Sequence, residues 1–262
     1  MSTPDTPPPT FASLSLHKSD CIRFLQFPED IYTDAQPVIL AVWPLGIQTS
    51  GFYGDAYQYK LKGRPFGRLF GPEVVGGIRV MRDLIIFLCG RSWEIVTPLL
   101  CSGHPGAKDT VVFRRRGVDV PPPEPVEWLV LGLLGNDRLR IVYDADGGKL
   151  SGGGEGGDGL GVDISGVKEM LEGMDRLQKG EWSHDSFEFK LKGMPWIAHG
   201  VATVKVRLLM LRVFEVLESL GWRARVAVGQ RSGNGDVRMA DTLYFVREMG
   251  EGRCGGAGLS LT

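Results

Sequence analysis

The stretch YQYKLKGRPF at residues 57–66 returns as FEFKLKGMPW at residues 187–196. Both copies follow the pattern aromatic-x-aromatic-Lys-Leu-Lys-Gly-x-Pro-aromatic, and a match of this length is not expected by chance. An apolar segment and then a tryptophan follow each copy, Trp93 in the first case and Trp222 in the second. Further on, both halves contain an Asp-Thr pair that leads into a strand-like run. We therefore interpret the chain as a duplicated unit.

Length and charge agree with two small soluble units. The 262 residues suffice for one large domain or two small ones, and the repeat favours two. The net charge of −1 provides no global field that would attract nucleic acid or anionic lipid, so binding of either needs a local patch. The sequence has no apolar run of about 18 residues, as a membrane span requires, and no signal peptide. We expect an intracellular protein, cytoplasmic or nuclear.

Strand-like and helix-like patterns alternate in the same order in both copies. Within the repeated stretch the apolar residues recur at every second position, as in a half-buried strand that Gly-x-Pro then ends. Helical spacing of apolar residues follows at residues 74–88 and 201–220, and a shorter helix is expected at residues 34–43 with Asp34 as its N-cap. The pattern predicts an α+β fold. It is a tandem duplication of a small strand-helix-strand-helix-strand-strand unit, with a mainly antiparallel sheet and the helices on one face.

Composition predicts the domain boundaries. Segments rich in proline, serine or glycine lack the apolar content that a packed core needs, and the run of prolines between the copies is typical of a stiff spacer. The predicted organisation is a disordered tail at 1–12, a first unit at 13–117, a proline-rich linker at 118–126, a second unit at 127–248 with a glycine-rich insertion at 147–161, and a flexible tail at 249–262. Duplication also suggests that the units meet about a pseudo-twofold axis, through the repeated strands or helices.

The polar feature common to both copies is a pair of lysines at alternate positions of the repeated strand. These side chains should point away from the apolar face of the strand. They could line a cationic groove for a phosphate, a lipid headgroup or single-stranded nucleic acid. The alternative is a solvated edge strand, where lysine prevents aggregation, and the arginines on the helix after each strand have the same solvated alternative. The candidate ligand-binding residues are Lys60, Lys62, Lys190, Lys192, Arg79 and Arg207.

The sequence matches cofactor and metal motifs only in part, and the residues around each match do not fit the motif. The GGGEGG segment at residues 152–157 matches G-x-G-x-x-G, but it does not connect a strand directly to a helix, as the dinucleotide fingerprint requires. An acidic run from Asp144 has Gly148 and Lys149 where a calcium loop needs a ligand and a glycine. The four cysteines form no C-x-x-C pair. We therefore expect no cofactor and no metal.

Two pairs of residues are the candidates for catalysis. Cys101 and His104 share a loop and could form a thiolate pair, and His184 beside Asp185 could be an oriented imidazole. Neither pair has a counterpart in the other copy, and the sequence contains no nucleophile elbow or spaced carboxylate pair. We therefore assign no catalytic residue.

These motifs together resemble a family of uncharacterised proteins, found mainly in fungi and also in animals. The pattern is Lys-Leu-Lys-Gly-x-Pro-Trp or -Phe, then a helix carrying arginine, then Gly-Trp, then Asp-Thr-Leu-x-Phe. The second copy is the better match, and the first departs from it at Phe66, Ser92 and Val111. The resemblance covers most of residues 20–114 and 128–248. It implies a compact α/β unit and no established activity, so no functional residue follows from it.

The sequence favours a non-catalytic intracellular binding or scaffold protein of unknown ligand, built from two homologous units. Its expected partner is a protein, with an anionic ligand at a local basic patch as a further option. One alternative is an enzyme with its site in the cleft between the units, around His184, Asp185 and Arg207. The other is a binder of nucleic acid or lipid headgroups that uses the repeated Lys-x-Lys strands on one continuous basic face.

Overall fold

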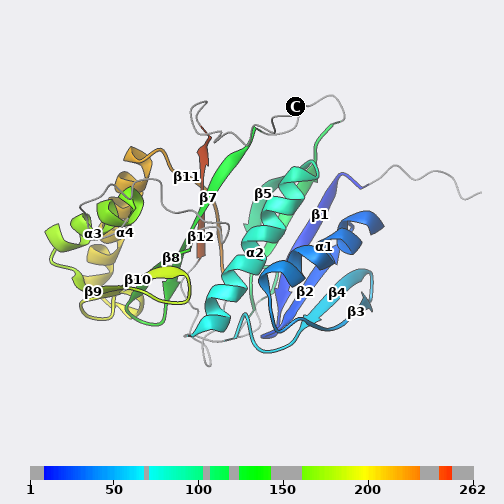
Figure 1. Ribbon diagram of the computed structural model, residues 1–262, viewed down its shortest axis with the longest axis horizontal. Coiled ribbons are helices and arrows are strands. Elements are labelled where there is room, and N and C mark those ends of the chain that lie inside the picture. Colours follow the sequence, from blue (N-terminus) through cyan, green and yellow to red (C-terminus); the bar gives the residue numbers. More distant parts are fainter. Residues whose placement is uncertain are drawn as a thin grey trace, which may run out of the picture.

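The computed structural model describes residues 9–67, 71–102, 107–117, 124–142, 161–230 and 242–249. Over these ranges the chain forms two six-stranded antiparallel sheets, each with two helices (Figure 1). The first unit comprises β1 (Phe11–His17), β2 (Cys21–Leu25), α1 (Glu29–Val42), β3 (Ile47–Tyr53), β4 (Ala56–Leu61), α2 (Pro72–Gly90), β5 (Trp93–Leu99) and β6 (Thr110–Arg115). The second comprises β7 (Val126–Leu134), β8 (Arg138–Val142), α3 (Val162–Gly173), β9 (Leu177–Trp182), β10 (Ser186–Leu191), the short 3-10 helix η1 (Pro195–Ile197), α4 (Ala202–Ser219), β11 (Arg223–Val228) and β12 (Thr242–Glu248).

The two sheets have the same topology. The strand order is β3-β4-β2-β1-β6-β5 in the first and, read from the corresponding edge, β9-β10-β8-β7-β12-β11 in the second. Every strand and helix of the first unit thus has a counterpart in the second, in the same chain order. The predicted class, a duplicated α+β fold with both helices of a unit on one face of its sheet, is confirmed.

The unit is larger than the sequence pattern predicted, with six strands in place of four. The edge strands β3 and β9 were missed because nearly all their residues are exposed or partly exposed, so they show no apolar alternation. The strand β1 was missed because it begins at Phe11, inside the stretch predicted to be a disordered tail. The first helix begins at Glu29 rather than near Asp34, and Pro28 occupies its N-cap.

The repeated stretch forms β4 and β10, as predicted. Tyr59 and Leu61 are buried in the first copy, and Phe189 and Leu191 are buried in the second, so the alternation places these side chains on the face that the helices cover. The lysines between them lie on the other face. Two residues after each strand, Gly63 and Gly193 have positive φ, where a residue with a side chain would be strained.

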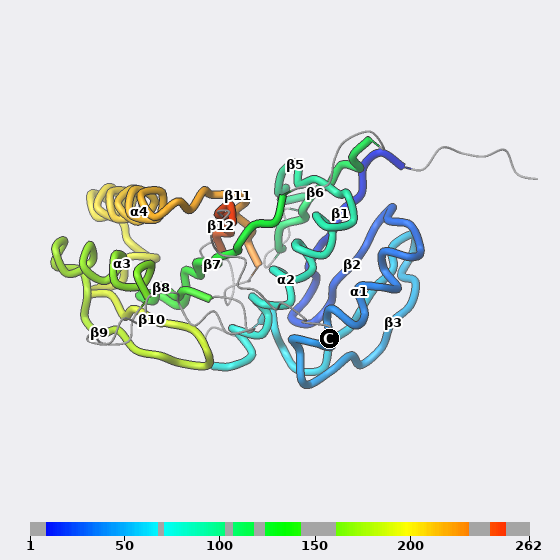
Figure 2. The backbone as a smooth tube through the Cα atoms, turned by 45° about the horizontal axis from the view of Figure 1, so that its top comes forward, coloured from blue at the N-terminus to red at the C-terminus, as the bar shows by residue number. Residues whose placement is uncertain are grey.

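The helix α2 lies between the two sheets, as Figures 1 and 2 both show. Alternate residues of β7 face opposite ways: Leu129 and Leu131 pack with α3 and α4, whereas Trp128 and Val130 join the core that contains α2. A Cβ placed on Gly132 would come within 3.2 Å of the Ile78 side chain of α2. The second sheet is therefore covered on both faces, once by its own helices and once by α2.

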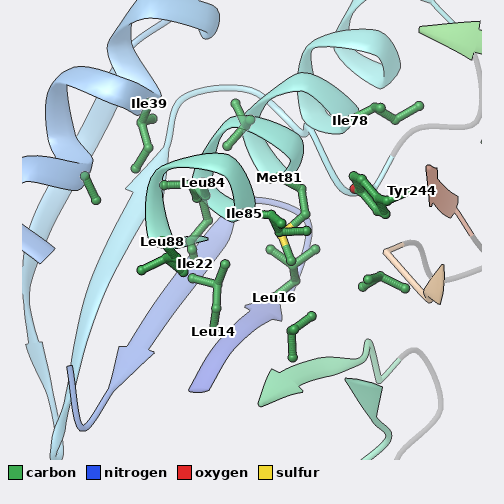
Figure 3. Close-up of a cluster of buried hydrophobic side chains, with 14 of the residues drawn as sticks. Leu14, Leu16, Ile22, Ile39, Ile78, Met81, Leu84, Ile85, Leu88 and Tyr244 are labelled. Atoms are coloured by element: carbon green, nitrogen blue, oxygen red, sulfur yellow. The ribbon is translucent and has the colours of Figure 1, made fainter. Parts of the chain in front are cut away.

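Side chains of α2 point to both the first and the second sheet. In Figure 3, Leu84 and Leu88 point toward Ile22 of the first sheet, whereas Ile78 lies on the side of Tyr244 from β12. The contact thus joins a helix of one unit to a sheet face of the other. A twofold axis would require the same surface on both sides, so the pseudo-twofold arrangement expected from the duplication is wrong.

The predicted boundaries of units, linker and tails stay predictions. Residues 118–123, 147–160 and 250–262 lie outside the described ranges. None of the described helices is long and apolar enough to cross a membrane.

Candidate functional site

The four repeated lysines lie in two separate environments. Lys60 is partly buried near the end of β4, and Lys62 is exposed just beyond the strand. Lys190 is partly buried in β10, opposite Arg138, and Lys192 is exposed at the end of that strand. Figure 1 places β4 and β10 on opposite sides of α2. The lysines of the two copies therefore do not form one continuous basic face, and that version of the anion-binding hypothesis is wrong.

The two candidate arginines also lie apart. Arg79 of α2 is not on a solvated face: its side chain is 14% exposed, and its guanidinium donates a hydrogen bond of 2.8 Å to the backbone carbonyl of Asp185. Arg207 of α4 is exposed and donates to the carbonyl of Thr203 at 3.1 Å.

Because α2 and α4 cover opposite faces of the second sheet, Arg207 does not meet His184 and Asp185. The proposed catalytic grouping of these three residues is wrong, and His104 of the other pair lies outside the described residues.

A pocket of about 240 Å³ lies beside the second copy of the repeated stretch. Its walls come from the end of β10 and the following loop, from the loop after α3, and from the first turns of α4. The lining residues are Arg176, Leu191, Lys192, Gly193, Met194, Pro195, Ala198, Ala202, Lys205, Val206 and Leu209. One of the predicted ligand residues, Lys192, thus lines this pocket.

The pocket combines three cations with an apolar floor. Arg176, Lys192 and Lys205 supply the charge, and the buried side chains of Leu191 and Leu209 supply the floor. Within the described ranges, Arg176 and Lys205 form no ion pair. Two of the three charges are therefore available to an anion, and the floor offers contact to an apolar body.

Hydrogen bonds to backbone carbonyls fix the pocket walls. The amide of Lys192 donates to the carbonyl of Arg176 at 2.7 Å, which holds the loop after α3 against the end of β10. The indole of Trp196 donates to the carbonyl of Arg138 at 2.9 Å and anchors the loop that follows the repeated stretch. The two loops that line the pocket are thus tied to the second sheet, which preorganises the pocket.

Lys192 has one carboxylate partner at the rim. Its ammonium donates to Asp175 at 2.5 Å, and this hydrogen bond lowers the pKa of the Asp175 carboxyl from its ordinary value. Both side chains are well exposed, so the pair is weak and open to competition. A ligand anion can therefore replace Asp175 as the partner of Lys192.

The corresponding space in the first unit is filled. Trp43 is buried, and its indole donates to the carbonyl of Lys62 at 3.0 Å. A Cβ placed on Gly63 would lie 2.8 Å from the Leu45 side chain and 3.4 Å from the Trp43 ring. A Cβ placed on Gly193, the matching residue of the second copy, would meet nothing within 4 Å. The same motif is closed in one copy and open in the other.

The two copies also differ in charge at this place. In the first copy the backbone amide of Lys62 donates to the carbonyl of Gly46, and in the second copy the backbone amide of Lys192 donates to the carbonyl of Arg176. Arg176 therefore stands at the position that Gly46 has in the first copy. In the first copy the carboxylate of Glu73, near the start of α2, accepts a hydrogen bond of 2.7 Å from the backbone amide of Arg64. The matching residue near the start of α4 is Thr203. Both differences make the second copy more positive.

Sequence reasoning found one of the three pocket cations. Arg176 and Lys205 were not predicted because the prediction rested on residues that the two copies share, and the copies differ at these two positions. A position-by-position comparison of the copies, which sets Arg176 against Gly46, would have revealed one of them.

One protein-family model matches the chain twice, over residues 10–114 and 127–246. The chain belongs to this domain family and carries two copies of its domain. The two matched segments coincide with the two structural units and with the two predicted copies. No curated protein and no solved structure matched the chain.

Proposed function

We propose that the protein is a non-catalytic binding protein whose second unit binds a small ligand with an anionic group and an apolar body. The ligand occupies the pocket beside residues 191–195. Its anion meets Lys192, Lys205 and Arg176, and its apolar part rests on the floor between β10 and α4. The first unit, closed by Trp43, has a structural role.

The observation that carries this proposal is the difference between the two copies of one motif. Leu45, the carboxylate of Glu73 and the Trp43 ring fill the space beside Gly63, whereas the space beside Gly193 is open. A purely structural duplication gives no reason to leave one copy open and to add cations around the opening. The described lining residues contain cations and apolar groups but no carboxylate, histidine or cysteine, which favours binding over acid–base or nucleophilic catalysis.

The test uses anilinonaphthalene sulfonate, a fluorescent probe with an anionic group on an apolar body. Titration of the full chain should give saturable binding. The combined substitutions Lys192→Glu and Lys205→Glu should weaken that binding at least tenfold, since each reverses a charge at the proposed anion position. Because both lysines are exposed, the thermal midpoint should change little.

The matched control is Lys62→Glu, the same change at the same motif position of the closed unit, and it should leave the affinity unaltered. N-phenylnaphthylamine, the uncharged counterpart of the probe, should bind the wild-type chain and the double variant equally. If the double variant binds the anionic probe as tightly as the wild type does, the pocket is not an anion site and the proposal fails.

A further inference from the structure

The backbone of the repeated stretch follows the same path in both copies. The glycine of the motif has a φ of 79° at Gly63 and of 78° at Gly193. Three backbone amides of each copy donate to carbonyls at equivalent places of the unit: Leu61, Lys62 and Phe66 in the first, and Leu191, Lys192 and Trp196 in the second. The residue after the glycine, Arg64 or Met194, therefore directs its N–H the same way in each unit.

One hydrogen bond of this stretch exists in the first copy alone. The backbone amide of Arg64 donates to the carboxylate of Glu73, in the first turn of α2, at 2.7 Å. The backbone amide of Met194 forms no hydrogen bond with any residue in the described ranges. The first turn of α4 contains no acidic residue. The second unit thus keeps the donor and lacks the acceptor.

The amide without an acceptor belongs to the pocket of the second unit. Met194 and Gly193 both line it, and the space beside Gly193 is open. In the first unit the same space holds the carboxylate of Glu73, since a Cβ placed on Gly63 would lie 3.0 Å from its Oε2 atom. The first unit therefore shows which chemical group fits against this amide, a carboxylate supplied by the chain itself.

The charges of the pocket suit a carboxylate that comes from solution. Arg176 and Lys205 line the pocket, and neither forms an ion pair within the part of the chain that the structure describes. The first turn of α4 also lies at the pocket, and the N-terminal end of a helix attracts negative charge. A carboxylate bound to the Met194 amide gains a charge-assisted hydrogen bond and compensates this positive surrounding.

We propose that the ligand of the second unit is a small carboxylic acid with an apolar body, whose carboxylate accepts a hydrogen bond from the backbone N–H of Met194. This inference rests on the proposed function, and it adds the chemical class of the ligand and the atom that recognises it. The carboxylate takes the place that Glu73 has in the first unit, and the apolar body lies on Leu191 and Leu209. One copy of the motif carries its own carboxylate, and the other binds one.

Three probes with one apolar body test the class of the anion. They are 2-naphthoate, 2-naphthalenesulfonate and 2-naphthyl phosphate, and calorimetric titration of the full chain measures their affinities. The carboxylate should bind at least about fivefold more tightly than the sulfonate or the phosphate, because its planar group has the shape of the Glu73 carboxylate. A sulfonate or phosphate that binds as tightly as the carboxylate, or more tightly, overturns the assignment to carboxylic acids.

The amide signal of Met194 tests the recognising atom. Labelling of the full chain with ¹⁵N-methionine gives few amide signals, and the signal missing from the spectrum of Met194→Leu is that of Met194. Saturation with 2-naphthoate should shift its proton downfield, as a new hydrogen bond to a carboxylate requires. An unshifted Met194 amide at saturation overturns the proposed contact.

An internal carboxylate provides the matched comparison. Ala202 lines the pocket at the first residue of α4, so Ala202→Glu places a carboxylate there as Glu73 does in the first unit. This variant should shift the Met194 proton downfield without ligand and bind 2-naphthoate at least tenfold more weakly. Ala202→Gln, of equal length and without charge, should do neither to the same extent. Equal effects of the two substitutions overturn the role of the carboxylate.

The outcomes separate this inference from the proposed function. If anilinonaphthalene sulfonate binds through Lys192 and Lys205 while 2-naphthoate shows no preference and leaves Met194 unshifted, the carboxylate is overturned and the anion pocket stands. If no anionic probe binds, both are overturned.

Discussion

The indole Nε1 of Trp43 donates a hydrogen bond to the carbonyl oxygen of Lys62 at 3.0 Å, and this contact closes the first copy of the repeated stretch. Trp43 is the C-cap residue of α1, and the C-cap residue of α3 is Met174. The loop from α3 to the next strand is also shorter by one residue, since α1 ends at Val42 and β3 begins at Ile47, whereas α3 ends at Gly173 and β9 begins at Leu177. A change of side chain and loop length therefore separates a closed unit from an open one.

Replacement of Trp43 by alanine should destabilise the protein by about 3–5 kcal/mol. The substitution removes a fully buried ring from the core that contains α2, and it leaves the carbonyl of Lys62 without its donor. Denaturant unfolding at equilibrium measures the change. Trp43→Phe retains most of the ring and loses the hydrogen bond, so its cost should be clearly smaller. Equal stability of Trp43→Ala and wild type would show that the indole does not support the first unit.

Replacement of Ala202 by tryptophan should block the pocket of the second unit without changing its charge. Ala202 is the exposed first residue of α4 and lines the pocket, so an indole at this position occupies the ligand's space. Binding of anilinonaphthalene sulfonate should fall at least tenfold, while the unfolding free energy should change by less than about 0.5 kcal/mol. Ser219→Trp, at the far end of the same helix, serves as control. Undiminished probe binding by Ala202→Trp would place the probe elsewhere on the molecule.

The sequence was sufficient to predict the duplicated α+β fold because the decisive residues are apolar and periodic. Tyr59 and Leu61, like Phe189 and Leu191, alternate with lysine and so mark a half-buried strand. The edge strands β3 and β9 could not be predicted from apolar periodicity, because backbone hydrogen bonds hold them and they bury few side chains. The packing of α2 on the second sheet was also missed, since β7 has no polar side chain from Trp128 to Leu134 and its two faces cannot be distinguished by period.

The candidate site was predicted in part for a related reason. Lys192 stands out because it is repeated, but its surroundings depend on Arg176 and Lys205, which come from the loop after α3 and from α4. The closure of the first copy depends on Trp43, which is distant in sequence from the motif that it covers. Contacts of this kind between separate elements follow from the packing of the unit and not from any local pattern.

The ion pair between Arg140 and Glu188 should be the most sensitive polar contact in the second sheet. Both side chains are 5% exposed, and the carboxylate of Glu188 accepts hydrogen bonds from Arg140 and from Arg138. Glu188→Ala leaves Arg140 buried without its partner charge and should cost about 3–5 kcal/mol in unfolding free energy. Denaturant unfolding measures this cost.

The first sheet supplies a milder substitution and a control for Glu188. By strand register, Arg23 and Gln58 are the counterparts of Arg140 and Glu188, and Arg23 donates to the amide oxygen of Gln58 at 2.8 Å. Glu188→Gln reproduces that pair and should cost less than Glu188→Ala. Gln58→Ala should cost about 1 kcal/mol, because the pair is neither fully charged nor fully buried. Equal losses for Glu188→Ala and Gln58→Ala would contradict a special role for the buried pair.

The stability of the protein should decrease below pH 6.5 in a way that depends on His17. Burial, with smaller contributions from the charges of Arg23 and Lys108, lowers the pKa of His17 from its ordinary value of 6.5 to about 4. Above pH 6.5 the imidazole is neutral in the folded and unfolded chains, so its protonation does not affect stability. Between pH 6.5 and about 4 the unfolded chain binds a proton that the folded chain does not, so the folded state is progressively disfavoured as the pH falls.

His17→Gln isolates this contribution from the other titrating groups. The glutamine keeps polar atoms near the Ser15 hydroxyl, which lies 2.9 Å from His17 Nε2, and near Arg23, whose guanidinium lies 3.3 Å from Nδ1. Denaturant unfolding of variant and wild type across the range from pH 6.5 to about 4 should show the wild type losing more stability than the variant. The difference reflects one proton, so its slope stays below about 1.4 kcal/mol per pH unit. Parallel pH profiles of the two proteins would show that His17 is protonated equally easily in the folded and unfolded chains.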